Sequence, residues 1–99
     1  MAVVEVSIVP LGSSSPSVSK YVKKALEVLR KEKIKFSLSA MGTILEDKSL
    51  DKVLKVVVKM HRAVLDGKEV KRVVTSIRID ERVDKHLSIE GKLKAVKND

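Results

Sequence analysis

The stretch Met41-Gly42-Thr43-Ile44-Leu45-Glu46 lies at the centre of this 99-residue chain, between two halves with the same pattern. Each half contains a strand-like segment, an amphipathic helical segment and a second strand-like segment. Glycine at position 42 permits a tight connection between neighbouring strands. The hexapeptide is therefore predicted to lie in a hairpin that joins the two halves.

Alternating, β-branched segments predict four strands. They span residues 2–9, 34–41, 43–46 and 71–79. In the first strand, Val4, Val6 and Ile8 should face one way, with polar residues between them facing the other. Residues 10–15 are rich in turn-forming types, so we expect the first strand to end before them.

Apolar residues that recur every three or four positions predict three helices. The first helix should begin after the capping hydroxyl of Ser15 and end near Lys33. The second is capped by Ser49 and should stop at Asp66-Gly67, because glycine readily adopts the left-handed conformation found at helix ends. A short third helix is expected to follow Ser88.

This order of elements predicts a single domain over residues 1–99, with an α+β, ferredoxin-like βαββαβ sandwich and a short third helix. Right-handed crossovers place the first two helices on one face of a four-stranded antiparallel sheet. The other face is left open, and its expected residues mix apolar and polar types. They are Val3, Glu5, Ser7, Val9, Val74, Ser76 and Arg78. Such a face suits a sheet-to-sheet dimer interface or a ligand pocket.

The composition limits the classes of partner. Twenty-one Lys and Arg residues against 13 Asp and Glu residues give a net charge of +8, which suggests nucleic acid at first sight. However, the basic residues are scattered over predicted solvent-facing helix positions, and only Tyr21 and Phe36 could stack on bases. A weak nucleic-acid binder therefore stays only as an alternative. The absence of cysteine suits a reducing cytoplasm, and neither a signal peptide nor an apolar run of about 20 residues is present. We expect a cytoplasmic protein without a membrane partner.

Other familiar uses of this fold need residues that the chain lacks. RNA recognition needs aromatic residues on the central strands, metal delivery needs paired cysteines, and acylphosphatase chemistry needs an arginine in the first loop. No serine is paired in sequence with a histidine that could activate it. His61 lies in an apolar stripe, which favours packing, and His86 has no second histidine at ligand spacing. We therefore expect neither an enzyme nor a metal site.

Five segments together resemble one family. They are Val9-Pro10-Leu11-Gly12, Ser17-Val18-Ser19-Lys20-Tyr21-Val22, Met41-Gly42-Thr43-Ile44-Leu45-Glu46, Arg72-Val73-Val74-Thr75-Ser76-Ile77-Arg78-Ile79-Asp80 and Glu90-Gly91-Lys92. In this order the chain resembles the small thiamine-binding proteins, which are ferredoxin-like relatives of the bacterial hydroxymethylpyrimidine- and thiamine-binding protein. It departs from the family at Asp47, where a glycine is usual.

The resemblance implies a non-catalytic protein that binds thiamine or its hydroxymethylpyrimidine part, phosphorylated or not. It also implies a homodimer, or a tetramer of two dimers, paired through the sheets. The candidate ligand-binding residues are Ser17, Met41, Thr43, Glu46 and Ser76. Thr43 and Glu46 could bind the aminopyrimidine ring, and serines near the start of the first helix could hold a phosphate.

Each candidate also has a structural explanation, which stays open at this point. Glu46 could be an edge charge that deters aggregation, and Met41 could fill core or interface space. Ser76 could be a small residue that permits close packing of the sheet. The alternative for the whole domain is a structural or interaction module without a small ligand.

Overall fold

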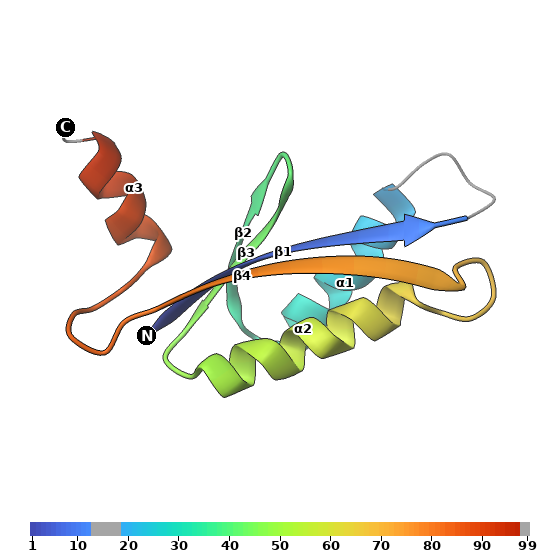
Figure 1. Ribbon diagram of the computed structural model, residues 1–99, viewed down its shortest axis with the longest axis horizontal. Helices are drawn as coiled ribbons and strands as arrows, with labels where there is room; N and C mark the ends of the chain where they lie inside the picture. The colour runs from blue at the N-terminus through green and yellow to red at the C-terminus, as the bar shows by residue number, and fades with distance from the viewer. Residues whose placement is uncertain (13–18, 98–99) are drawn as a thin grey trace.

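The computed structural model describes residues 1–12 and 19–97 and confirms the ferredoxin-like order of elements (Figure 1). The elements are β1 (Ala2–Leu11), α1 (Ser19–Glu32), β2 (Lys35–Ser39), β3 (Gly42–Asp47), α2 (Leu50–Val64), β4 (Arg72–Glu81) and α3 (Ile89–Lys97). The predicted start of the first helix, with Ser15 and Ser17, lies outside the described residues. In this part of the chain no helix is long and apolar enough to cross a membrane.

The sheet is antiparallel throughout, in the order β2-β3-β1-β4. β4 pairs with β1 along its whole length, from Ala2 opposite Glu81 to Leu11 opposite Arg72. The ladder between β1 and β3 is shorter and ends at Val6 opposite Thr43. Residues 7–11 of β1 therefore extend beyond the β2–β3 hairpin, and this overhang positions the candidate site described below.

The first strand is longer than predicted, because β1 continues through Pro10 to Leu11. Pro10 lies opposite Val73 of β4, on the part of β1 that β3 no longer accompanies. A proline has no N–H to donate, so it is tolerated where a strand has a neighbour on one side only. The prediction of a break at residue 10 was wrong for this reason.

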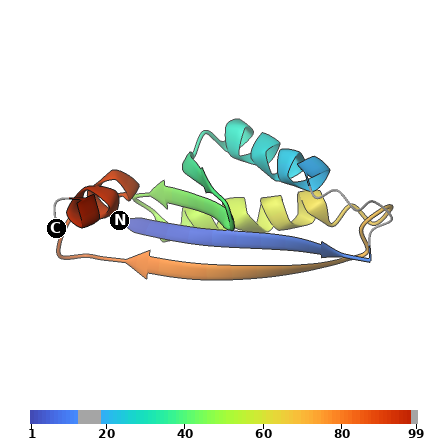
Figure 2. The same ribbon diagram turned by 90° about the horizontal axis from the view of Figure 1, so that it is seen from above.

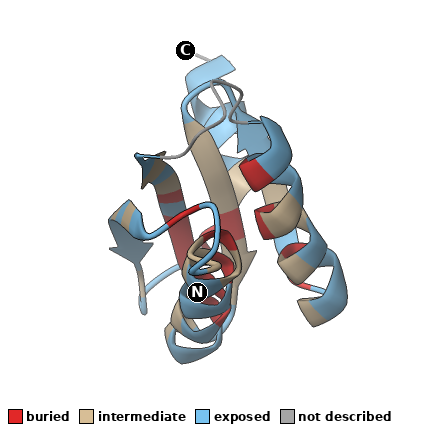
Figure 3. Cartoon of the chain, turned by 90° about the vertical axis from the view of Figure 1, so that its right-hand side faces the viewer, coloured by how far each residue is buried: buried red, intermediate tan, exposed pale blue. Residues whose placement is uncertain are grey.

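The core lies between the two long helices and one face of the sheet (Figure 3). Val4 and Val6 of β1 and Leu45 of β3 are fully buried there, as their alternation predicts. Each of the two long helices contributes a stripe of buried residues to the core. Their buried residues are Tyr21, Ala25, Leu29, Val53, Val56, Val57, Met60 and Val64. Ser49 caps α2 by accepting a hydrogen bond from the backbone N–H of Lys52, as expected.

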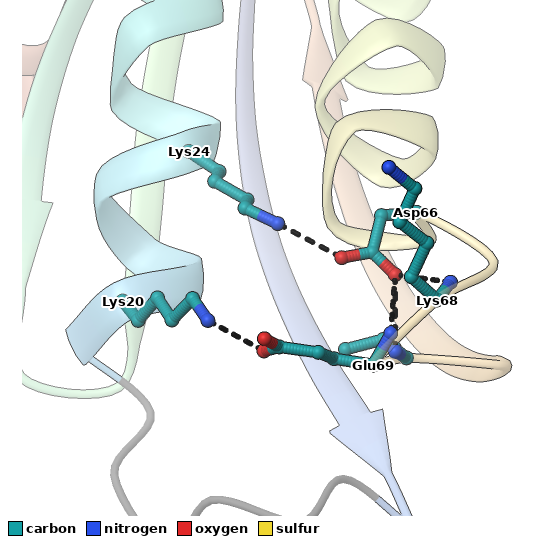
Figure 4. A network of polar contacts seen from close by, with 6 residues as sticks. Lys20, Lys24, Asp66, Lys68 and Glu69 are labelled. Carbon is teal, nitrogen blue, oxygen red and sulfur yellow. Dashed lines mark hydrogen bonds and ion pairs between the residues drawn. The ribbon is translucent and has the colours of Figure 1, made fainter.

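A polar network ties α1 to the loop between α2 and β4 (Figure 4). Asp66 accepts hydrogen bonds from the backbone N–H groups of Lys68, Glu69 and Val70 through one oxygen, and from the Lys24 ammonium at 2.9 Å through the other. The backbone bond from Val70, followed by the bond from Lys24, holds the pKa of the Asp66 carboxyl well below its usual range. Because Lys24 lies one turn from Tyr21 on α1, the network also fixes the part of α1 that carries Tyr21.

The face of the sheet opposite the helices is open along most of its length, as predicted. The exception is Val3, which was expected to be exposed on this face. Val3 is buried at the end of this face, because the segment before α3 covers it. Glu46 lies opposite Val3 in the sheet, and its carboxylate accepts a hydrogen bond from the backbone N–H of Ile89. Ser88 caps α3 as predicted, since its hydroxyl accepts the backbone N–H of Gly91 at 2.9 Å. α3 itself projects from the end of the sheet, with Leu93 53% and Val96 74% exposed (Figure 2).

Candidate functional site

A cavity of about 340 Å³ lies where β1 extends beyond the hairpin. Val6 and Ile8 of β1 line one side, and the hairpin residues 38–43 line another. α1 and α2 close the remaining sides. Their lining residues are Tyr21, Val22, Ala25, Met60 and Val64. A space of this size is at the lower end of the range for small-molecule sites.

Tyr21 places a hydroxyl with an unused hydrogen-bonding capacity beside this cavity. The residue is only 2% exposed and belongs to the buried stripe of α1. Its hydroxyl is buried and has no hydrogen-bond partner among the described residues. A buried hydroxyl without a partner costs about 1–3 kcal/mol, so such groups are normally satisfied by protein, water or ligand. A polar group bound in the cavity could supply the missing partner.

The hairpin adds hydroxyl groups and an apolar rim but no charge. Thr43 faces the helices, because it pairs with Val6 in the ladder, and it lines the cavity. Ser39 also lines the cavity, and its hydroxyl donates to the carbonyl of Gly42 at 3.0 Å. Met41 lies at the turn and is 85% exposed. Among the described residues that line the cavity there is no carboxylate, lysine or arginine, so this lining suits an uncharged group.

Gly42 brings the hairpin close to β1 rather than forming the turn itself. A Cβ atom at this position would lie 2.8 Å from the backbone carbonyl oxygen of Val6. Real Cβ atoms do not approach a backbone oxygen so closely, so only glycine permits this spacing without a shift. The chain reverses one step earlier, over Ala40 and Met41.

The structure brings together two of the five predicted ligand residues. Met41 and Thr43 line the cavity, whereas Ser17 lies outside the described residues. Glu46 is three positions from Thr43 on the same strand, and side chains an odd number of positions apart point to opposite faces of a sheet. Ser76 also lies on the open face, directly opposite Ser7 of β1.

Glu46 instead anchors the C-terminal helix. One of its carboxylate oxygens accepts the backbone N–H of Ile89 at 2.6 Å, and the other lies 3.5 Å from the ammonium of Lys35. Lys35 also pairs with Glu90 at 2.6 Å, which raises the pKa of Lys35 and lowers that of Glu90. These contacts give Glu46 a structural partner on a different face from the cavity.

Sequence reasoning missed Tyr21 as a candidate. The residue falls in the apolar stripe of its helix, which indicates a core residue, and it is a core residue by burial. The available signal was the hydroxyl, because a tyrosine in a core needs a hydrogen-bond partner and no polar residue shares its stripe.

A second groove of about 340 Å³ lies between α2 and β4. Val58 and Arg62 of α2, and Leu65 just after its end, face Thr75 and Ile77 of β4 across it. His61 spans the groove, with its Nδ1 atom 2.6 Å from the Thr75 hydroxyl, which agrees with the packing role expected for this histidine. Over residues 1–12 and 19–97, no cluster of His, Asp or Glu side chains could hold a metal ion.

The family model described as thiamine-binding protein matches residues 4–97. The chain belongs to the thiamine-binding protein family. This agrees with the resemblance carried by the five sequence segments, and the match extends from β1 into α3.

Relatives of known sequence or structure support this membership. A UPF0045 protein of Methanocaldococcus jannaschii is 54% identical over 94 residues, covering 95% of this chain and 90% of its own. Its crystal structure superimposes with a TM-score of 0.86, at 52% identity over 97% of this chain and 95% of that chain. A domain of unknown function from Bacillus cereus has a TM-score of 0.81 and 32% identity, covering 93% of this chain and 86% of that chain.

A more distant structure shares the fold of the thiamine-binding protein family. It is a candidate thiamine biosynthesis or salvage protein of Thermotoga maritima, with a TM-score of 0.79. Its identity to this chain is 19%, over 96% of this chain and 97% of that chain. At this identity the likeness shows the fold alone.

Proposed function

We propose that this protein binds thiamine or hydroxymethylpyrimidine without transforming it, and that the aminopyrimidine ring occupies the cavity beside Tyr21. The observation that carries the proposal is that Tyr21 lines a cavity of suitable size, while its buried hydroxyl has no hydrogen-bond partner among the described residues. Membership of the thiamine-binding protein family supports the choice of ligand.

The chemistry of the cavity favours the pyrimidine half of the vitamin. An aminopyrimidine is flat and uncharged, with ring nitrogens that accept hydrogen bonds and an amino group that donates them. The cavity has mostly apolar walls, and the hydroxyl-bearing residues Tyr21 and Thr43 are among those that line it. The thiazolium ring is a cation, and no acidic residue is among the described residues that line the cavity, so this ring should lie toward solvent near the exposed Met41.

The absence of a reactive pair among the lining residues supports a binding role. The described lining residues include hydroxyl groups but no histidine, lysine or carboxylate that could act as a general base. Binding without chemistry is therefore the function that these residues support best.

We also propose that copies of the chain associate through their open sheet faces. Val9 and Val74 are exposed there, next to the polar residues Ser7 and Ser76. Burying these valines against a second sheet would remove apolar surface from water. The end covered by the segment before α3 limits such contact to the remainder of the face.

Isothermal titration calorimetry tests the ligand. Thiamine, its mono- and diphosphates, and hydroxymethylpyrimidine are titrated separately into the protein at moderate salt. We expect saturable binding of hydroxymethylpyrimidine and thiamine at one site per chain. Binding of the phosphorylated forms alone would indicate a site that recognises the phosphate group and not the pyrimidine ring. Silence for all four compounds would refute the proposal.

A further inference from the structure

One edge of β1 has no neighbouring strand where it passes the cavity. The ladder between β1 and β3 ends at Val6 opposite Thr43, and β1 runs on past the β2–β3 hairpin (Figure 1, Figure 2). Continuing the same register would place Ile8 opposite Met41, but Met41 lies in the turn and is exposed. The side of β1 that faces β3 is therefore unpaired at Ile8.

Hydrogen bonds at the start of β1 fix the direction of its backbone groups. The Met1 ammonium donates to the carbonyl of Arg82 at 3.3 Å, and the N–H of Arg82 donates to the carbonyl of Met1 at 3.1 Å. The ladder with β4 continues from this pair without a slip, and hydrogen-bonded pairs alternate with non-hydrogen-bonded pairs in antiparallel strands. Odd-numbered residues of β1 therefore bond to β4, and even-numbered residues direct their N–H and C=O groups away from it.

Two further observations agree with this alternation. A Cβ atom at Gly42 would lie 2.8 Å from the carbonyl oxygen of Val6, so that carbonyl points toward β3. Pro10 has no N–H, and the alternation puts the missing donor on the side away from β4, where no ladder bond is lost. Ile8 has the same parity as Val6 and Pro10. Its N–H and C=O have no hydrogen-bond partner among the described residues.

The cavity beside Tyr21 extends to this edge. Val6, Ser7 and Ile8 all line it. The side chain of Val6 is buried among the helices, whereas Ser7 lies on the open face, opposite Ser76. A cavity that is lined by consecutive residues with side chains on opposite faces of the sheet meets the strand at its backbone. The unpaired N–H and C=O of Ile8 therefore border the same cavity as Tyr21.

We propose that the backbone N–H and C=O of Ile8 recognise the aminopyrimidine ring. Recognition at Ile8 rests on the proposed function and names the groups that select the pyrimidine. The N–H of Ile8 donates to the ring nitrogen beside the amino-bearing carbon, and the amino group donates to the C=O of Ile8. The second ring nitrogen stays available as an acceptor for the hydroxyl of Tyr21.

The hydrogen-bonding edge of the ligand is complementary to that of the strand. An aminopyrimidine carries an acceptor beside a donor, and a β residue directs a donor and an acceptor to the same side. Among the described lining residues, no carboxylate, asparagine or glutamine side chain offers a fixed donor or acceptor, and the hydroxyl groups rotate. The backbone of Ile8 is held in position by the ladder on its other side, so it can discriminate between ligands by the order of donor and acceptor.

Pro10 makes the free edge suitable for a small ligand and not for an added strand. A strand pairing with residues 7–11 would require N–H donors at alternate positions, and position 10 has none. On the side away from β4, this part of β1 therefore offers a single N–H, at Ile8. One donor with an adjacent acceptor matches a flat heterocycle.

A change of the ligand tests the order of donor and acceptor. Hydroxymethylpyrimidine is compared by calorimetry with its analogue in which an oxo group replaces the amino group. In the analogue the oxo group accepts and the neighbouring ring nitrogen carries a hydrogen, so the two roles are exchanged. We expect the analogue to bind the natural chain about ten- to a hundredfold more weakly. Equal affinity for the two compounds would overturn the proposal.

Ile8→Pro and Ile8→Val form a matched pair of variants. Their side chains are similar in size, but only Ile8→Pro removes the N–H. Because this N–H does not bond to β4, we expect both variants to fold and Ile8→Pro to bind hydroxymethylpyrimidine about two- to twelvefold more weakly than Ile8→Val. Ser7→Pro removes an N–H that bonds to β4, so its urea midpoint should lie well below that of Ile8→Pro. A midpoint of Ser7→Pro at or above that of Ile8→Pro would contradict the alternation and overturn the proposal.

An ester in place of the amide between Ser7 and Ile8 removes the same N–H and keeps the Ile8 side chain. The 99-residue chain is short enough for chemical synthesis by segment ligation. The ester decides the outcome if Ile8→Pro does not fold, and we expect the same two- to twelvefold loss of affinity. Affinity that is unchanged by loss of the Ile8 N–H would overturn recognition at Ile8 and leave the proposed function standing. Absence of binding to the natural chain would refute both.

Discussion

The carboxylate of Glu46 accepts the backbone N–H of Ile89 at 2.6 Å, and this contact joins the third strand to the first turn of the C-terminal helix. Only Leu87 and Ser88, just before that helix, are buried in the segment from residue 83 to residue 97. The helix is therefore held at its beginning, by polar contacts, while its apolar residues Leu93 and Val96 stay exposed.

Replacing Glu46 with alanine should loosen α3 and leave the sheet intact. A charge-assisted hydrogen bond contributes about 1.5–3 kcal/mol, so the local opening of residues 86–97 should become roughly ten- to a hundredfold more frequent. Hydrogen exchange followed by mass spectrometry measures this. Glu5→Ala, an exposed carboxylate on the same face, is the control and should not change exchange in α3. Unaltered exchange in Glu46→Ala would show that the bond does not hold the helix.

The conservative variant Glu46→Gln separates the structural role of this residue from a ligand role. Glu46 faces away from the cavity, so we expect the affinity for hydroxymethylpyrimidine to be the same as in the natural chain. Calorimetric titration of the two proteins side by side measures it. A large loss of affinity with unchanged folding would place the ligand on the open face instead.

Replacing Tyr21 with phenylalanine should weaken ligand binding while leaving the free protein as stable or making it more stable. The substitution removes only a buried hydroxyl that has no partner among the described residues. If the ligand satisfies that hydroxyl, its loss costs about 0.5–1.5 kcal/mol of binding, or roughly two- to twelvefold in Kd. Calorimetry and chemical denaturation measure the two effects. Unchanged affinity would exclude the hydroxyl as a ligand contact.

Adding a methyl group at Gly42 should strain the junction of the hairpin with β1. The new Cβ would lie 2.8 Å from the Val6 carbonyl oxygen, so a backbone must move. We expect Gly42→Ala to lower the free energy of unfolding by about 1–3 kcal/mol, measured with a denaturant. Ala40→Ser, in the exposed turn of the same hairpin, should change it little. Equal stability of Gly42→Ala and the natural chain would refute the close-approach explanation.

The Asp66 network predicts a loss of stability in acid. Because the folded-state pKa of Asp66 lies below its unfolded value of about 3.9, its contribution is complete above that value and disappears as the pH falls below it. Asp66→Asn should be less stable than the natural chain at pH 7, and the difference should shrink from about pH 4 downward. Thermal unfolding at a series of pH values measures it, with Glu27→Gln on exposed α1 surface as control. A constant difference across this range would be inconsistent with titration of Asp66.

Much of the fold could be predicted because its signals are local. Alternation placed Val4, Val6 and Leu45 on the buried face, and the serines at positions 49 and 88 marked the helix starts that the structure confirms. Alternation could also have separated Thr43 from Glu46, since three positions along one strand always reverse the face. The sequence alone therefore places Thr43 and Glu46 on opposite faces of the sheet.

The sequence by itself determined the order of strands and helices, because hydrophobic period and capping residues act within a few neighbouring positions. Only the tertiary structure decided how far each strand extends past its neighbour. That offset lets β1 accept Pro10, opens the cavity beside Tyr21 and brings Ile89 to Glu46 across 43 positions. These features depend on which segments become neighbours in space, and a local sequence pattern carries no information about such distant partners.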